Sequence, residues 1–261
     1  MPPAPLEPEP ALCHKPHMES QEYDLMDMAE HQLWWYRALH QRLITALSGV
    51  SGRVLDAGCG TGGFLANLAA ARPGLVLEGL EYNDIAASRA AAKSGARITQ
   101  GSINALPYEA NRFDAVTSSD VLCHEAVDPR LALTELYRVL RPGGLLVVNM
   151  PAYKWLASAH DRRVHNARRS TPAELRHWLK ADGFSDIRTQ FWNSLLFPAM
   201  VLQRKLLARG EAASDVATIS PGLNASFLAI TQMEAHLPAL PWGGSIIATA
   251  RKPLSKPEPI P

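Results

Sequence analysis

The chain contains few cysteines: the three among its 261 residues form neither a Cys-x-x-Cys pair nor an even set. A disulfide framework is therefore excluded as the basis of the fold, and this usage is typical of a reducing compartment, so we expect a cytoplasmic protein. The first residues show no basic segment followed by an apolar run, so no signal peptide is expected. No apolar run approaches the roughly 18 residues that a membrane span requires.

The chain also lacks an excess of either charge, since its formal net charge is +1 at pH 7. No global field attracts it to nucleic acid or to an anionic membrane, and we expect no nucleic-acid partner. Internal repeats are absent. Histidine, cysteine and carboxylate residues nowhere complete a coordination set, so no metal is predicted. The 47% of hydrophobic residues suffices for one core and a small cap.

Proline is concentrated at the two ends of the chain. Residues 1–18 and 253–261 are rich in proline, cannot build a core, and are expected to be disordered tails. A single domain is therefore predicted over residues 19–252.

Glycine is concentrated in one turn, at positions 58, 60, 62 and 63. A buried strand precedes this turn and a helical spacing follows it, an arrangement that presents bare backbone N–H groups to a nucleotide-like ligand. The spacing of positions 58, 60 and 63 also fits the dinucleotide fingerprint. However, Asp56 lies at the strand tip, where a carboxylate suits a cationic ligand rather than a pyrophosphate, so NAD is disfavoured.

The run Asp-Ala-Gly-Cys-Gly-Thr-Gly at positions 56–62 resembles the first motif of class I S-adenosylmethionine (SAM)-dependent methyltransferases. The run Leu-Arg-Pro-Gly-Gly at positions 140–144, followed by an apolar strand, is the second specific match. The resemblance implies an α/β fold: a Rossmann-like, seven-stranded sheet with six parallel strands and one antiparallel strand. It also implies SAM as the cofactor.

Ahead of the glycine turn, the run Glu-His-Gln-Leu-Trp-Trp-Tyr-Arg at positions 30–37 resembles a segment of a bacterial branch of the same superfamily. In that branch the segment caps the cofactor, which implies cap helices within residues 19–49. Tyr36 and Arg37 would then line the methionine end of the cofactor. The alternative is that Trp34 and Trp35 only pack this helix on the domain.

The resemblance also assigns residues to the rest of the cofactor. Glu81, about 20 residues beyond the glycines, would accept the ribose hydroxyls. Tyr82 would cover the adenine, and Ser102 stands where the family usually has an aspartate. The backbone of Ser118 would hold the methionine ammonium group. The full predicted set is Tyr36, Arg37, Asp56, Ala57, Gly58, Cys59, Gly60, Gly62, Glu81, Tyr82, Ser102, Ile103 and Ser118.

Two histidines are candidates for a general base. His124 follows the fourth predicted strand, residues 113–117, within a run that resembles the family's Asp-Val-Leu-Glu-His. A structural role for His124 at a helix start is equally open. His160 lies in an insertion over residues 150–170 and is favoured, because Asp161 and several arginines surround it in a polar loop. A solvated loop with Asp161 paired to an arginine is the alternative.

A second insertion, residues 192–242, contains two apolar helical pieces and is predicted to form a lid over the acceptor pocket; packing or dimerisation is the alternative. The leading hypothesis is methyl transfer to a small-molecule acceptor, with oxygen as one candidate target atom. A lipid or polyprenyl-type acceptor, with the lid in peripheral contact with a membrane, is the second hypothesis, and a SAM-binding protein without transfer is the third. The sequence leaves the acceptor and the oligomeric state open.

Overall fold

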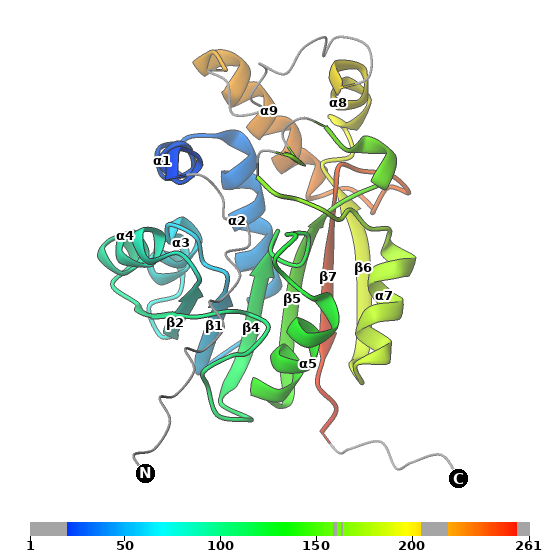
Figure 1. Cartoon of the computed structure of the whole chain (residues 1–261). Coiled ribbons are helices and arrows are strands. Elements are labelled where there is room, and N and C mark those ends of the chain that lie inside the picture. Colours follow the sequence, from blue (N-terminus) through cyan, green and yellow to red (C-terminus); the bar gives the residue numbers. More distant parts are fainter. Residues whose placement is uncertain (1–19, 159–160, 163, 205–218, 255–261) are drawn as a thin grey trace, which may run out of the picture.

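The computed structural model describes residues 20–158, 161–162, 164–204 and 219–254. Its centre is a seven-stranded sheet with the order β3-β2-β1-β4-β5-β7-β6 (Figure 1). The strands are β1 (Arg53–Ala57), β2 (Val76–Glu81), β3 (Arg97–Gln100), β4 (Phe113–Ser119), β5 (Leu140–Pro151), β6 (Ser185–Trp192) and β7 (Ser245–Arg251). β7 runs antiparallel between β5 and β6, and the other six strands are parallel. The predicted fold class is confirmed.

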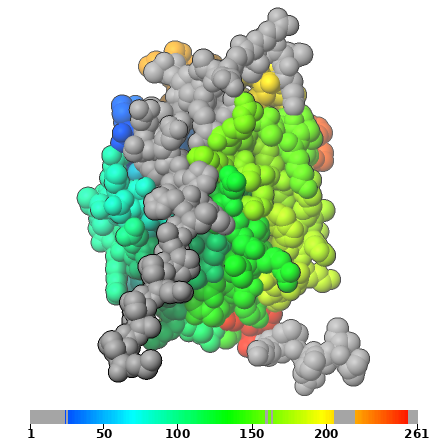
Figure 2. Space-filling view, in the orientation of Figure 1, coloured from blue at the N-terminus to red at the C-terminus, as the bar shows by residue number. Residues whose placement is uncertain are grey.

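Helices cover both faces of this sheet. They are α1 (Ser20–Ala29), α2 (Trp34–Ala46), α3 (Gly63–Ala71), α4 (Asp84–Ser94), α5 (Pro129–Val139), α7 (Pro172–Ala181), α8 (Phe197–Leu202) and α9 (Pro221–Glu234), with a 3-10 turn η1 (Lys154–Leu156). Figure 2 shows the face on which the green and yellow-green segments, including α5 and α7, lie at the surface.

The two faces carry separate clusters of buried side chains, because successive residues of a strand point to opposite faces. Leu55 and Val116 pack with α5 and α7, whereas their neighbours Val54 and Ala115 pack with α2 and α3. Both clusters are continuous across the central strands. The parallel strands are therefore apolar on both sides, as a sheet covered by helices requires.

Local sequence signals account for several element boundaries. Thr171 and Glu174 form a reciprocal capping box at the start of α7, with proline in the first turn. Residues 141–144 lie within β5, but the backbone turns there: Gly143 has a left-handed φ of 80°, and the register between β4 and β5 shifts before Leu145. Here the chain leaves α5 directly into the strand, and the Lys252 amine holds the Leu140 carbonyl at 2.8 Å.

The second insertion lies at the carboxyl ends of the parallel strands, where Figure 1 shows α8 and α9 beyond the sheet. α9 packs along α2 rather than directly on the sheet, with the rings of Trp34 and Phe227 edge to face at 5.5 Å. No helix within the described residues is long and apolar enough to cross a membrane.

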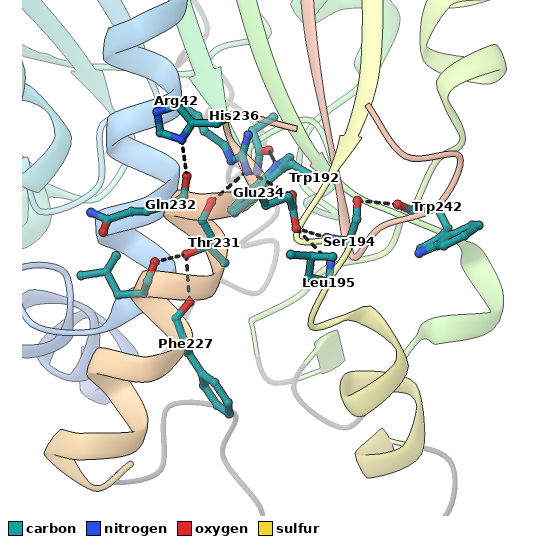
Figure 3. A network of polar contacts seen from close by, with 12 residues as sticks. Arg42, Trp192, Ser194, Leu195, Phe227, Thr231, Gln232, Glu234, His236 and Trp242 are labelled. Carbon is teal, nitrogen blue, oxygen red and sulfur yellow. Dashed lines mark hydrogen bonds and ion pairs between the residues drawn. The ribbon is translucent and has the colours of Figure 1, made fainter. Parts of the chain in front are cut away.

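A buried ion pair fixes the end of α9 (Figure 3). Glu234 accepts a hydrogen bond from Arg42 of α2 at 3.0 Å, and its other oxygen accepts from the backbone N–H groups of Ser194 and Leu195. The Arg42 guanidinium also lies over the Trp192 ring, 5.2 Å from its centroid. One carboxylate therefore joins α2, α9 and the segment that follows β6.

Candidate active site

The glycine turn joins β1 to α3, and its backbone lies so close to neighbouring residues that side chains at the glycine positions would clash with them. Gly58 and Gly62 have φ angles of 92° and 87°, in the left-handed region. A Cβ at Gly58 would lie 2.3 Å from Val121 Cγ2, and one at Gly62 would lie 2.6 Å from Ala90 Cα. The turn is also hydrogen-bonded to β2, because the N–H groups of Gly58 and Cys59 donate to the Leu80 carbonyl.

Asp56 occupies the end of β1 directly before this turn and is 3% exposed. Thr117 of the adjacent β4 donates a hydrogen bond to it at 2.8 Å. Burial raises the pKa of Asp56 to about 7, against the effect of the Thr117 hydrogen bond, and the nearby charges of Glu81 and Glu30 act in the same direction as burial. A bound cation would offset this repulsion.

Glu81 ends β2 and holds the turn from the other side. Its carboxylate oxygens accept from the backbone N–H groups of Gly60, at 2.9 Å, and Asn83, at 3.0 Å. Each carboxylate oxygen can accept a second hydrogen bond, so this arrangement still suits a ligand hydroxyl. Two carboxylates therefore lie beside one glycine turn, Asp56 near the end of β1 and Glu81 at the end of β2.

The other predicted cofactor residues on the sheet edge lie in different environments. Tyr82 is exposed beside Glu81, whereas Ile103 is buried in the main core. The Ser102 hydroxyl accepts from the Asn104 backbone at 3.2 Å, within a local turn. Ser118 is buried and donates its hydroxyl hydrogen to the Ala57 carbonyl at 3.1 Å, so it ties β4 to β1.

Tyr36 and Arg37 lie in the first half of α2. The Tyr36 ring is 6.2 Å from that of His40, which in turn lies 5.7 Å from Phe64 at the start of α3. Burial lowers the pKa of His40 to about 4. The Arg37 side chain is exposed. The structure thus brings Tyr36 toward α3, and it shows no contact between Arg37 and the glycine turn among the described residues.

Of the two candidate bases, only His124 is described; His160 lies outside the described residues. His124 is partly buried after β4, where its backbone bridges to Asn166 of the first insertion. Burial lowers the pKa of His124, and His165 adds to the effect. The neutral imidazole is therefore favoured, which is the form that accepts a proton.

Sequence reasoning missed Asp120, which follows β4 and has a left-handed φ of 54°. Asn149 of β5 donates to its carboxylate at 2.9 Å. Trp192 fixes the direction of that amide, because an indole can only donate and bonds to Asn149 Oδ1 at 2.8 Å. Burial raises the pKa of Asp120 to about 7. Asp120 belongs to the same sequence run as His124, and its position directly after a strand is the signal that could have identified it.

The first insertion is organised by a buried ion pair rather than a solvated one. Arg169 donates to both oxygens of Asp161, at 2.8 and 2.9 Å, and Arg169 also donates to the Ala152 carbonyl. The predicted pairing of Asp161 with an arginine is confirmed, but both side chains are buried. No cluster of metal-ligating side chains occurs among the residues that the structure describes.

The comparison with protein families places this site in a known context. Residues 55–148 match the model of a methyltransferase domain. The chain is 33% identical over 126 residues to demethylmenaquinone methyltransferase of Clavibacter sepedonicus, a match that covers 48% of this chain and 49% of that protein. The chain thus spans about half the length of this curated relative.

Solved structures share the fold over a longer range. A SAM-dependent methyltransferase from Thermotoga maritima, described as a possible histamine N-methyltransferase, matches with a TM-score of 0.60 at 20% identity, covering 89% of this chain and 95% of that chain. Phosphoethanolamine N-methyltransferase 2 of Haemonchus contortus, solved in complex with SAM, matches with a TM-score of 0.54 at 19% identity, covering 88% of this chain and 60% of that chain. At these identities the likeness shows the fold alone.

Proposed function

Because the chain contains a class I SAM-dependent methyltransferase domain, we propose that it transfers a methyl group from SAM to a small-molecule acceptor. The observation that carries this proposal is the convergence of Asp56 and Glu81 on the glycine turn between β1 and α3. The Asp56 carboxylate is buried among negative charges that favour a cationic partner. The Glu81 carboxylate lies at the end of β2, a position that suits a ribose diol.

The residues of the turn fit this cofactor in a further respect. The Thr61 hydroxyl oxygen, in the middle of the glycine turn, is buried and has no hydrogen-bond partner among the described residues. Buried polar atoms are rarely left unpaired, so a polar ligand at this turn accounts for it. A dinucleotide fits less well, since its pyrophosphate would lie near Asp56 and Glu81.

SAM supplies an electrophilic methyl group when it is bound. The chain must then position an acceptor atom in line with that methyl group and, where the acceptor is a hydroxyl, receive its proton. His124 and Asp120 follow β4 at the edge where open α/β sheets bind ligands, and they are the described residues that we assign to this proton transfer. The Asn149 amide would hold Asp120 in place.

The second insertion is the element that we place over the acceptor. α8 and α9 lie at the same edge of the sheet as the glycine turn (Figure 1). Tyr153, which follows β5, stacks on Phe191 of β6 at 5.2 Å and contacts Phe197 of α8 at 5.6 Å. This aromatic cluster gives the acceptor side an apolar wall, which favours an acceptor with an apolar portion.

A screen with labelled SAM tests the proposal directly. Purified protein is incubated with methyl-labelled SAM and pools of hydroxyl, amine and thiol compounds, and transfer is followed by extraction of labelled product. Isothermal calorimetry measures the affinity for SAM beside that for NAD as the matched control. SAM binding with product formation supports the proposal, SAM binding without any product supports a binding protein, and NAD binding without SAM binding contradicts both.

A lipid-type acceptor is the second candidate, and it is favoured by the exposed apolar side chains around α8. α8 contains no buried residue, and Leu202 at its end is 49% exposed. Trp155 and Trp242 are also about half exposed in the neighbouring segments, at 50% and 44%. The Clavibacter relative is named a demethylmenaquinone methyltransferase, and a quinone acceptor fits this alternative.

A further inference from the structure

The carboxylate of Glu30 lies at the N-terminus of α3, although it belongs to the segment that follows α1. Glu30 is 4% exposed, and one of its oxygens accepts from the Gly63 backbone N–H at 3.1 Å. The first N–H groups of a helix have no partner within the helix, and a carboxylate satisfies one of them while complementing the helix dipole. Glu30 therefore acts as the cap of α3 from 33 positions away in the sequence.

The local sequence cannot supply this cap itself. The N-cap position is Gly62, which makes no side-chain hydrogen bond and has a φ of 87°. A serine or aspartate there would meet Ala90 of α4, since even a Cβ would lie 2.6 Å from Ala90 Cα. The backbone of the turn therefore requires glycine at position 62, and the group that caps α3 comes from another part of the chain.

Glycine is required at position 63 to make room for the Glu30 side chain, not to adopt an unusual backbone angle. It is the first residue of α3 and is not among the glycines with positive φ. A Cβ at this position would lie 2.3 Å from Glu30 Cδ. The fourth glycine of the run thus makes room for the carboxylate, which explains why the run extends beyond the spacing of the turn.

Two cationic side chains of α4 form ion pairs with Glu30 and with the preceding helix α1. Lys93 forms ion pairs with both Glu30 and Asp27, and Arg89 pairs with Asp24 at 2.6 Å. Arg89 and Lys93 are four residues apart and so lie on one face of α4. α4 follows Glu81 directly, so these contacts connect α1 to the ribose side of the predicted cofactor site.

Met26 brings the same helix against the turn. A Cβ at Gly60 would lie 2.8 Å from Met26 Cε, so the methionine side chain is in contact with the glycine backbone. Met26 and Glu30 are one helical turn apart, and the Glu30 N–H donates to the Met26 carbonyl. Together they form a wall on the glycine turn at Gly60 and Gly63.

We propose that Glu30 is a positioning residue of the cofactor site: its carboxylate fixes the N-terminus of α3 and thereby the conformation of the turn that receives SAM. This inference rests on the proposed function, since it takes SAM as the ligand. Glu30 acts through Gly63 rather than by contact with the reacting atoms. The sequence run at positions 30–37 thus begins with a residue of the cofactor site.

The experiment measures SAM affinity by isothermal calorimetry on the full chain. Glu30→Gln keeps an oxygen that can accept from Gly63, Glu30→Met keeps the size and removes the acceptor, and Gly63→Ala displaces the carboxylate without changing it. Asp24→Asn is the matched control, because it removes an exposed α1–α4 ion pair that does not reach the turn. Thermal melting without SAM establishes that each variant is folded.

We expect the methionine and alanine variants to bind SAM at least tenfold more weakly, with the glutamine variant and the control within threefold of the wild type. The double variant Glu30→Met/Gly63→Ala should bind SAM no more weakly than the weaker of the two single variants, since both substitutions remove the same contact between Glu30 and Gly63. Unchanged affinity in Glu30→Met overturns the proposal, as does equal weakening in Asp24→Asn or loss of folding in Glu30→Gln. Absence of SAM binding by the wild type would contradict the proposed function instead.

Discussion

At the scale of single residues, the site is built from carboxyl groups whose environments differ. Asp56 lies near the end of β1 and Asp120 directly follows the neighbouring strand β4, and burial raises the pKa of both to about 7. Glu81 instead accepts two backbone hydrogen bonds. Perturbed carboxyl groups gather at functional sites because ligand charges or proton transfer require them. These residues therefore allow separate predictions.

Removing the Glu81 carboxylate should weaken SAM binding. Glu81→Ala deletes the carboxylate that we propose as the acceptor for the ribose hydroxyls and also frees the Gly60 and Asn83 N–H groups. The change therefore costs at least one charged hydrogen bond, about 1.5–3 kcal/mol. Calorimetry should show a Kd raised by roughly tenfold to a hundredfold. Arg176→Ala is the control, because this exposed side chain of α7 bonds to Thr189 of β6, away from the glycine turn. Unchanged affinity in Glu81→Ala would refute the assignment.

The protein without cofactor should lose stability between pH 6.5 and pH 8. The folded pKa of Asp120 is raised from 3.8 to about 7, so the folded state binds a proton more tightly than the unfolded state, and this stabilisation is lost as the pH rises through 7. The loss is on the order of 0.5 kcal/mol for this carboxyl group.

Urea unfolding over this range checks the prediction. Asp120→Asn should show a shallower loss than the wild type, while Asp84→Asn at an exposed position should leave the loss unchanged. Below pH 6.5 the lowered pKa of His40 acts in the opposite direction, since stability falls as the pH drops toward 4. An equal slope for wild type and Asp120→Asn would contradict the account of Asp120.

The sequence was informative for residues that follow a strand within a recognisable motif. Asp56 and Glu81 were predicted because each ends a strand near the glycines, and both lie at the turn. Glu30 and Asp120 were missed in these roles because their meaning depends on partners distant in the sequence. Glu30 needs Gly63 and Lys93, and Asp120 needs Asn149. No local pattern encodes those contacts.

At the scale of elements, the junction of α2, α9 and the end of β6 depends on Glu234 (Figure 3). Three donors converge on its carboxylate, and one of them is the partly buried Arg42. Burial lowers the pKa of Arg42, while Glu234 counteracts this shift. A buried charge that loses its partner is strongly destabilising.

Glu234→Gln should therefore lower the free energy of unfolding by about 3 kcal/mol, because the amide leaves Arg42 without an opposite charge and turns an N–H donor toward other donors. Urea denaturation measures the change. Gln232→Ala on the same helix is the control; its only described side-chain contact is a 3.4 Å bond to Gln41, and it should change stability by less than about 0.5 kcal/mol. Equal effects of the two variants would contradict the assigned role.

Strands were easier to predict than the insertion between them. Apolar runs bounded by glycine and proline placed the strands, and the family resemblance gave their order. The position of α9 along α2 depends on contacts such as Asn224 with Trp34, which are 190 residues apart. Apolar spacing predicted a helix there but could not indicate which surface it covers.

At the scale of the whole molecule, the choice between a dissolved and a membrane-held acceptor depends on how the protein meets a lipid surface. Its net charge of +1 gives no attraction to anionic headgroups. The exposed apolar side chains around α8 belong to separate segments: η1, the end of α8 and the loop before β7. Stable binding to an interface needs a continuous apolar face or a basic patch.

We therefore expect the protein to remain in the dense fraction when it is floated with phosphatidylethanolamine–phosphatidylglycerol vesicles at about 0.15 M salt, where long-range attraction is screened. Flotation of the wild type would instead favour the lipid-type acceptor. In that case Trp155→Ser and Trp242→Ser should each reduce it, because tryptophan inserts its ring at the headgroup level. Tyr82→Ser, which is 55% exposed beside the cofactor turn, is the matched control. Flotation that all three variants retain would exclude the surface around α8 as the contact with the vesicle.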